Sequence, residues 1–297
     1  MLELKKAARE QVKIKIGLAG SAGSGKTASS LLLGYGIVGD WSKIALIDTE
    51  NRSSELYAGA KFGDVTIGDF NVIHIAPPFT PEKYIEAMDM CLKASEIELI
   101  ILDSMSQEWD GKGGVLEIHT NMPGNSFTNW GKLTPRHNRF IDSIIHANKF
   151  VICTMRTKQD YVLVEKNGKQ VPEKVGLKAI TREGVDYEFT LVFDIDIKHH
   201  ATSSKDRTNL FMDKPDFVVT PETGMTIKKW CESGVASTPE ITPSEAITRL
   251  AMCNSVEELK LLKETLPATV ISDKGFNDAA KARFKEITTT ETQPTLL

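Results

Sequence analysis

The stretch that most constrains the fold is GSAGSGKT, from Gly20 to Thr27. It fits the pattern G-x-x-x-x-G-K-[S/T], with a β-branched apolar run before it and a helix-forming run after it. The glycines let the backbone curl so that successive N–H groups point inward, and the following helix adds the positive end of its dipole. The sequence therefore predicts a phosphate-binding loop between a strand and a helix. Its expected phosphate-binding residues are Gly20, Ser21, Ala22, Gly23, Ser24, Gly25, Lys26, Thr27 and Ala28.

Two acidic residues after apolar runs fit a site for Mg²⁺ and ATP. Asp103 ends LIILD and is expected to hold Mg²⁺ with the hydroxyl of Thr27, while Lys26 reaches the β- and γ-phosphates. Hydrolysis also needs a base, and the residue after Asp103 is Ser104, which cannot serve. Glu50 follows the run ALIDT, and the C-terminal ends of adjacent parallel strands meet, so Glu50 is expected to orient the attacking water.

Strand-like and helix-like segments alternate along the chain, which predicts an α/β fold with a mostly parallel sheet. The strand-like segments are VKIKIGLAG, KIALIDTE, NVIHIA, ELIILDS and FVICTMR, and helices are expected near 81–95 and 132–147. An Asn167-Gly168 pair predicts a β-hairpin beyond Arg156. YEFTLVFDIDIKHHATSSKDRTNLF then reads as two more strands that add antiparallel partners to the sheet.

The composition of the chain predicts its domain organisation. Residues 1–11 form an N-terminal extension and residues 12–233 the core. Small residues and prolines in 234–243 indicate a linker. Two or three short helices are expected in a C-terminal module, 244–288, followed by a disordered tail, 289–297.

Charge, cysteine usage and hydropathy exclude several classes of protein. A net charge of -4 gives no global attraction to nucleic acid, so any DNA contact needs a local basic surface. The four cysteines lie far apart and indicate neither a zinc site nor a disulfide framework. His199 and His200 are adjacent on a predicted strand, where they point to opposite faces and do not form a metal pair. Without a membrane-spanning run or a signal segment, we expect a soluble protein in the cytoplasm.

In this order, GSAGSGKT, LIDTE and LIILDS resemble the RecA-like recombinase core. Together with CTMRTKQDY, EGVDYEFTLVFDID and SSKDRTNLF, they make the chain similar to phage-encoded RecA-like P-loop ATPases of the AAA family, linked to single-strand annealing and recombination. The likeness covers roughly residues 12–233. It implies a RecA-like P-loop NTPase core that acts in DNA metabolism, in the host cytoplasm if the chain is phage-encoded.

The resemblance also implies roles for individual residues. Glu50 takes the place of the catalytic base, and VICTMR that of the γ-phosphate sensor, for which the chain offers Thr154 and Arg156. Lys205 and Arg207 match a cationic pair that reaches across a subunit interface to the neighbour's ATP. Such a cation stabilises the charge that develops on the transferred phosphoryl group. The expected assembly is a homo-oligomer, a ring or a filament, with ATP at its subunit interfaces.

Single-stranded DNA is expected on two loops, about 104–135 after the magnesium acid and about 157–186 after the sensor strand. Trp130 in the first loop could stack on a base or cap the edge of the core. The second loop is rich in lysine but has interleaved acids, so it is only mildly basic. Its basic residues are Lys158, Lys166, Lys169, Lys174, Lys178 and Arg182, and its acids are Asp160, Glu165, Glu173 and Glu183.

Two functional hypotheses follow. The first is a Mg²⁺-ATP-dependent ATPase that binds single-stranded DNA and promotes annealing or recombination, with a single-strand DNA-binding protein as a possible partner of the C-terminal helices. The second is a nucleotide-switched interaction protein that acts on a replication or host-defence partner without binding DNA. A P-loop kinase is a weaker third reading, because the sequence has no clear lid segment with paired arginines.

Overall fold

Nearly continuous apolar runs form the central strands of the sheet, as expected for strands buried on both faces. In the computed structural model, β1 (Lys15–Gly20), β2 (Ile44–Asp48) and β6 (Leu99–Asp103) are buried at every position. The structure describes residues 6–166, 169–235, 243–266 and 268–291. The chain divides into two compact units, 1–235 and 236–297.

The sheet of the first unit has the strand order β11-β10-β9-β1-β7-β6-β2-β5, with β8 paired to β7 outside this row. The six strands from β9 to β5 pair in parallel, whereas β10 and β11 pair antiparallel at one edge. The predicted α/β class with a mostly parallel sheet is therefore confirmed. The remaining bounds are β5 Asn71–His74, β7 Phe150–Lys166, β8 Lys169–Ala179, β9 Leu191–Ile195, β10 His200–Asp206 and β11 Phe217–Val218, and β3 (Lys61–Phe62) and β4 (Val65–Thr66) form a separate pair.

One expectation about the sheet is wrong. The strand β9 was expected to be antiparallel but runs parallel to β1, and only β10 and β11 reverse direction. The segment before β9 returns to the start of β1, where the Thr190 N–H donates to the Lys15 carbonyl at 2.9 Å. The chain therefore enters β9 at the same end of the sheet as β1 and must run alongside it.

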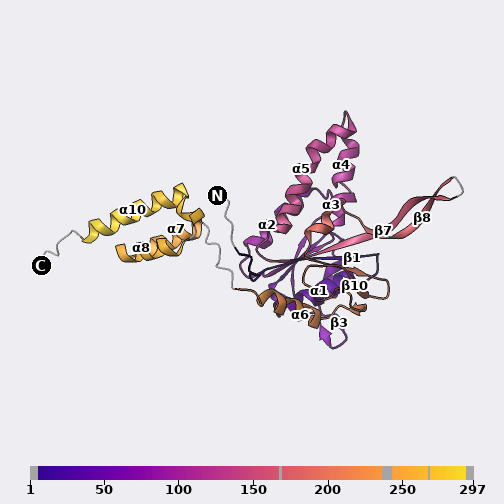
Figure 1. The fold of residues 1–297 in the computed structure, drawn as a ribbon, viewed down its shortest axis with the longest axis horizontal. Coiled ribbons are helices and arrows are strands. Elements are labelled where there is room, and N and C mark those ends of the chain that lie inside the picture. The colour runs from indigo at the N-terminus through magenta and orange to yellow at the C-terminus, as the bar shows by residue number, and fades with distance from the viewer. Residues whose placement is uncertain (1–5, 167–168, 236–242, 267, 292–297) are drawn as a thin grey trace. The chain divides into compact units, whose positions relative to one another are not determined.

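Helices cover both faces of this sheet (Figure 1). α1 (Lys26–Val38) and α6 (Pro221–Glu232) pack on one face, and α2 (Pro81–Lys93) and α5 (Ser126–Ile145) on the other. Each helix contributes buried apolar residues to one of two separate core clusters. Short 3-10 turns occur at Trp41–Lys43, Ser53–Tyr57 and Val185–Glu188.

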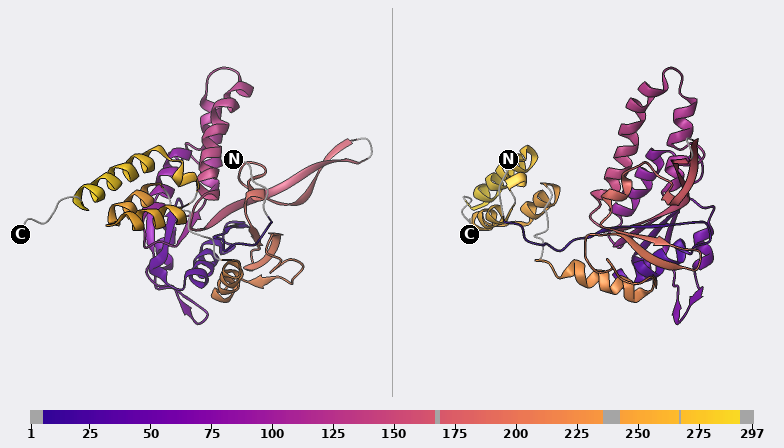
Figure 2. Two further views of the ribbon diagram at one scale, coloured as in Figure 1. Left: turned by 60° about the vertical axis from the view of Figure 1, so that its left-hand side comes forward. Right: turned by 45° about the vertical axis from the view of Figure 1, so that its right-hand side comes forward.

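The segment 104–135, expected to be a loop, is largely helical. It holds α3 (Ser106–Asp110), α4 (Val115–Asn121) and the first half of α5, which begins earlier than the predicted 132. The Asn125 side chain caps α5 by accepting from the Phe127 N–H at 2.8 Å. α4 and α5 form a helical hairpin that projects from the core (Figures 1 and 2).

A second projection is the β7–β8 hairpin. Its strands pair antiparallel from Thr157 with Ala179 to Lys166 with Lys169. This confirms the predicted hairpin, although the turn residues 167–168 lie outside the described residues. β7 is one continuous strand. Its first part pairs within the central sheet, and its second part pairs with β8 in the projection (Figure 2).

The second unit has its own apolar core. Its described residues form α7 (Pro243–Met252), α8 (Val256–Thr265), α9 (Ala268–Ile271) and α10 (Lys274–Glu291), more than the two or three short helices expected. α10 continues through residues 289–291, the start of the expected tail, and residues 292–297 lie outside the described part. Most of the expected linker, 236–242, and the start of the extension, 1–5, also lie outside it.

The four cysteines, Cys91, Cys153, Cys231 and Cys253, are buried and unpaired. Burial raises the pKa of the Cys91 thiol to about 11. Within the described residues, no helix is both long enough and apolar enough to cross a membrane.

Two glycines allow α1 and α6 to approach closely. A Cβ atom on Gly36 would lie 2.0 Å from the Pro221 carbonyl oxygen, and one on Gly224 would lie 2.3 Å from the Leu33 carbonyl oxygen. Both contacts are with backbone, which cannot rotate away. The position of α1, and with it the phosphate loop at its start, depends on this close packing.

We predict that Gly36→Ala lowers the free energy of unfolding of the first unit by about 1–3 kcal/mol through overpacking. Gly131→Ala is the matched control, because a Cβ on this α5 residue meets nothing within 4 Å and should stabilise the helix by about 0.5–1 kcal/mol. Denaturation followed by tryptophan fluorescence measures both, since all 4 tryptophans lie in the first unit. A neutral effect of Gly36→Ala would contradict the packing argument.

Candidate nucleotide site

The glycine-rich loop between β1 and α1 has the geometry of an anion site. Gly23 and Gly25 adopt φ of 79° and 87°, conformations that favour glycine. Gly25 caps α1 without a side-chain hydrogen bond, and the first turn of the helix has no acidic residue. The positive end of the helix dipole and its N–H groups are therefore open to a phosphate.

The lysine of the loop is held in place by the loop itself. Lys26 is buried, and its Nζ donates to the carbonyl oxygens of Gly20 at 3.0 Å and Ser21 at 2.8 Å. Burial lowers the pKa of Lys26, although the nearby carboxylates of Asp103 and Glu50 oppose this shift. A bound phosphate would compete with the two carbonyls for the same ammonium group.

The other predicted loop residues share this segment. The Ser24 side chain is buried, and its hydroxyl has no hydrogen-bond partner within the part of the chain that the structure describes. Ala22 is exposed at the turn, and Ala28 is buried in the first turn of α1. The predicted segment, Gly20 to Ala28, thus runs from the end of β1 through the loop into the first turn of α1.

The carboxylate of Asp103 joins three elements beside the loop. It accepts from the Thr27 hydroxyl of α1 at 2.6 Å and from the Thr154 hydroxyl of β7 at 2.5 Å. Only 2% of Asp103 is exposed, and burial raises the pKa of its carboxyl group while the two hydroxyl donors lower it. The predicted metal residues, Thr27 and Asp103, are therefore in direct contact.

These residues fit a magnesium ion. Mg²⁺ prefers oxygen ligands and is usually bound through one or two protein groups together with phosphate oxygens and water. The Thr27 hydroxyl and the Asp103 carboxylate supply such a pair next to the phosphate loop. Within the described residues, no group of three or more His, Cys, Asp or Glu side chains could bind a metal without a further ligand source.

Glu50 lies beyond the end of β2 and is paired with Arg156. The Arg156 Nε donates to the Glu50 carboxylate at 2.9 Å, and both side chains are partly exposed. Arg156 lies level with Gly20 in the parallel pairing of β7 and β1. The structure therefore brings together two predicted site residues that are separated by 106 positions in sequence.

The turn that carries Glu50 is held by hydrogen bonds to Asp48, which the sequence analysis did not predict. Asp48 is buried and accepts from the backbone N–H groups of Glu50 at 2.6 Å and Ser54 at 2.9 Å, and from the Ser54 hydroxyl. Thr49 ties the same turn to β6, since its hydroxyl accepts from the Ser104 N–H at 2.9 Å. The available signal was an aspartate at the end of a buried strand, two residues before the predicted base.

The two adjacent histidines have different partners. The His199 ring nitrogen Nδ1 lies 2.9 Å from the Ser24 carbonyl oxygen of the phosphate loop, whereas His200 pairs with Asp216 at 2.9 Å. A Cβ on Gly25 would lie 2.9 Å from the same ring nitrogen of His199. His199 thus packs against the phosphate loop, a position that no motif in the sequence indicated.

The predicted cationic pair does not reach the phosphate loop of its own chain. Lys205 and Arg207 both donate to the Tyr187 carbonyl, Arg207 at 3.0 Å. Lys205 of β10 lies opposite Val192 of β9, and Val192 in turn lies opposite Gly17 of β1. Lys205 is therefore level with the first half of β1, whereas the phosphate loop begins at the end of β1. The pair is compatible with a role at ATP only if the ATP belongs to another subunit.

Trp130 is not a free stacking surface. Its ring stacks on His119 at 4.2 Å and on Trp109 at 5.9 Å between ring centroids. These contacts join α3, the C-terminal half of α4 and the first turns of α5. Of the two roles considered for Trp130, the structure favours packing of the core edge.

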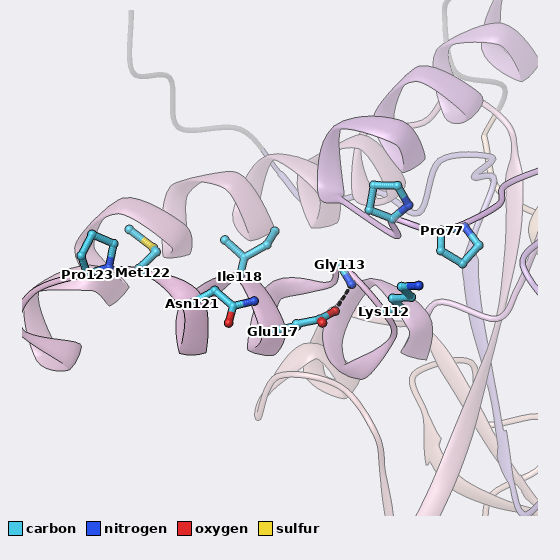
Figure 3. Close-up of a pocket in the computed structure, with 9 residues that line it drawn as sticks. Pro77, Lys112, Gly113, Glu117, Ile118, Asn121, Met122 and Pro123 are labelled. Carbon is cyan, nitrogen blue, oxygen red and sulfur yellow. Dashed lines mark hydrogen bonds between the residues drawn. The ribbon is translucent and has the colours of Figure 1, made fainter.

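A separate hollow of about 660 Å³ lies beside α4 (Figure 3). Pro77, Lys112, Ile118 and Met122 are among its lining residues, and the Glu117 carboxylate accepts from the Gly113 N–H at its edge. No residue of the phosphate loop lines it. It is therefore distinct from the nucleotide site.

A phosphate loop after β1, a buried aspartate at the end of β6 and an α/β core define a P-loop NTPase. The family comparison agrees, since the model of the AAA domain family matches residues 12–222, more than half of the chain. The protein belongs to the AAA domain family. It is a nucleotide-binding protein of the AAA type, and membership indicates nucleotide-dependent ATPase activity, typically with Mg²⁺. No curated protein sequence matches the chain.

We predict that Thr154→Val raises the Mg²⁺ concentration needed for nucleotide binding by about 10- to 100-fold, because Asp103 loses a donor that orients it. Thr154→Ser retains the hydroxyl and should restore the wild-type requirement. Titration of Mg²⁺ against a fluorescent ATP analogue measures the effect. An unchanged Mg²⁺ requirement in the valine variant would show that Thr154 does not position the acid.

Proposed function

We propose that the protein is a Mg²⁺-ATP-dependent, RecA-like ATPase that binds single-stranded DNA and promotes annealing or recombination in phage DNA metabolism. The observation that carries the proposal is the position of the two projections. The α4–α5 hairpin follows β6, which ends in Asp103, and the β7–β8 hairpin follows the strand with Thr154 and Arg156. These are the two places where a RecA-like plan holds DNA.

The geometry of the site supports the following catalytic roles. The loop N–H groups and Lys26 bind the phosphates, and Thr27 and Asp103 would hold Mg²⁺, which neutralises phosphate charge. Glu50 orients the attacking water and accepts its proton. To do so it must leave the ion pair with Arg156, whose guanidinium then turns to the γ-phosphate. Nucleotide binding and release of the base are thus coupled through one ion pair.

The site is completed by a neighbouring subunit. Lys205 lies on β10, the second strand from one edge of the sheet, and Arg207 directly follows this strand. Both side chains donate to the Tyr187 carbonyl. A cation that enters from a neighbour is worth about 10³ to 10⁵ in rate for arginine fingers. We therefore propose a homo-oligomer, a ring or a filament, with ATP at its subunit interfaces.

The β7–β8 hairpin supports DNA binding through its register. Lys158 lies directly opposite Lys178. Like charges directly across a strand pair are destabilising, so a polyanion that neutralises these two lysines stabilises the hairpin. Lys178 also has Glu183 at 3.6 Å, which agrees with the mildly basic character of this segment.

The helical hairpin supplies an aromatic side chain. Phe127 lies at the start of α5, near the tip of the projection, with 86% of its surface exposed. An exposed ring of this kind suits stacking on an unpaired base, at about 1–3 kcal/mol. It takes the role that was considered for Trp130.

We predict that Lys158→Ala combined with Lys178→Ala weakens binding of single-stranded DNA. It should also reduce the slope of log K against log salt by about 0.7 for each lost phosphate contact. Lys61→Ala, an exposed lysine on β3, is the control and should change neither value. Fluorescence anisotropy of a labelled oligonucleotide over a salt series, with and without ATP, measures both.

The same titration separates the second hypothesis. If no DNA binds at low salt in either nucleotide state, the DNA role is wrong, and a nucleotide-switched interaction protein with a replication or host-defence partner becomes the better reading. Recruitment of a single-strand DNA-binding protein by the C-terminal unit belongs to the first hypothesis.

A further inference from the structure

The second unit has a groove between two of its helices that the ATPase site does not use. α8 and α10 each line it with side chains at helical spacings of three and four, so one continuous face of each helix is exposed to it. From α8 these are Val256, Leu259, Lys260 and Lys263, and from α10 they are Asn277, Ala280, Lys281 and Phe284. Leu250 of α7 completes the groove, whose volume is about 320 Å³.

The floor and wall of this α8–α10 groove are apolar. Leu250 and Leu259 are 4% and 9% exposed and belong to the core of the unit, so the floor is rigid. Phe284 on the wall is 47% exposed, and an aromatic ring left this open stabilises a fold little. Exposed apolar surface with a polar rim is typical of a site that binds a side chain of a partner.

The rim of the groove carries only positive charge. Lys260, Lys263 and Lys281 are exposed, no acidic residue lines the groove, and none of these lysines forms an ion pair within the described residues. The second unit as a whole is acidic, with 7 basic and 9 acidic residues in 236–297. Three of its 7 basic residues therefore gather around one apolar groove.

We propose that the α8–α10 groove binds an acidic peptide segment of a partner protein, with one bulky apolar side chain of that segment as its anchor. The anchor fills the space between Leu259, Ala280 and Phe284, and the peptide's carboxylates lie against the lysine rim. Charge complementarity decides between occupants. The backbone of a nucleic acid would match the lysines, but it has no aliphatic side chain to fill the space above Leu250 and Leu259.

Peptide binding to the full chain tests the proposal. The probe is a short fluorescent peptide with several aspartates and a single phenylalanine, and its affinity is measured by anisotropy at low salt. We expect saturable binding. Replacement of the peptide's aspartates with asparagine, or of its phenylalanine with alanine, should weaken the affinity by about tenfold or more.

Matched variants assign the binding to the groove. Lys281→Glu should weaken the affinity by about tenfold, whereas Lys274→Glu, the same charge change on the same helix but outside the groove, should leave it unchanged. Phe284→Ala should also weaken it, with Leu261→Ala, another exposed apolar residue, as its control. Unchanged circular dichroism of each variant shows that the unit remains folded.

Four results would overturn the proposal. The first is the absence of saturable peptide binding, and the second is an equal loss of peptide affinity in Lys281→Glu and Lys274→Glu. The third is displacement of the peptide by a single-stranded oligonucleotide in a protein that also carries Lys158→Ala and Lys178→Ala. The fourth is peptide binding that occurs only after residues 292–297 are removed. The third would assign the groove to nucleic acid, and the fourth to the chain's own C-terminal residues. ATP hydrolysis in Lys281→Glu should equal that of the wild type, which keeps this test separate from the proposed ATPase function.

Discussion

The buried carboxylate of Asp103 is the contact on which the nucleotide site depends. Asp103, at the end of β6, contacts the first turn of α1 through Thr27 and the central-sheet part of β7 through Thr154. Burial alone would make a charged carboxylate unfavourable, and the two hydroxyl donors offset that penalty. Because each donor comes from a different element, Asp103 holds the start of α1, the end of β6 and β7 in place relative to one another.

The strand β7 connects the nucleotide site to the projecting β7–β8 hairpin. Its first residues lie in the central sheet beside β1 and β6, and its later residues form half of a projecting hairpin. Arg156 lies at the change between the two parts, where its guanidinium holds Glu50. A change in the partner of Arg156 therefore acts on the base at one end and on the start of the hairpin at the other. We propose this ion pair as the physical link between nucleotide state and the proposed DNA-binding surface.

Local motifs were predictable from sequence, and contacts between distant segments were not. The phosphate loop and Asp103 follow from short patterns flanked by strand and helix signals, and the structure places them together. The Glu50–Arg156 pair joins residues 106 positions apart, and the sequence analysis predicted both residues but not their contact. The hydrogen bonds to Asp48 and the packing of His199 on the phosphate loop depend on turn geometry, which a residue pattern does not predict.

The segment 104–135 shows why the helices were missed. The resemblance to the RecA-like core implied a loop here, and Gly131 is a poor helix former. In the fold, Leu133, Phe140 and Ile144 lie buried along one face of α5, and the burial outweighs the low propensity. The direction of β9 was missed for a related reason, since strand pairing depends on where the chain returns to the sheet.

If ATP is hydrolysed between subunits, as proposed, two inactive variants should restore activity to each other when they are mixed. Glu50→Gln lacks the base but keeps Arg207, while Arg207→Ala lacks the cation but keeps Glu50, so each alone should bind ATP and fail to hydrolyse it. In an equimolar mixture that assembles at random, about a quarter of the head-to-tail interfaces join an intact Glu50 to an intact Arg207. We predict that ATP turnover in the mixture returns to about a quarter of the wild-type rate. A mixture no more active than the two variants measured separately would contradict it.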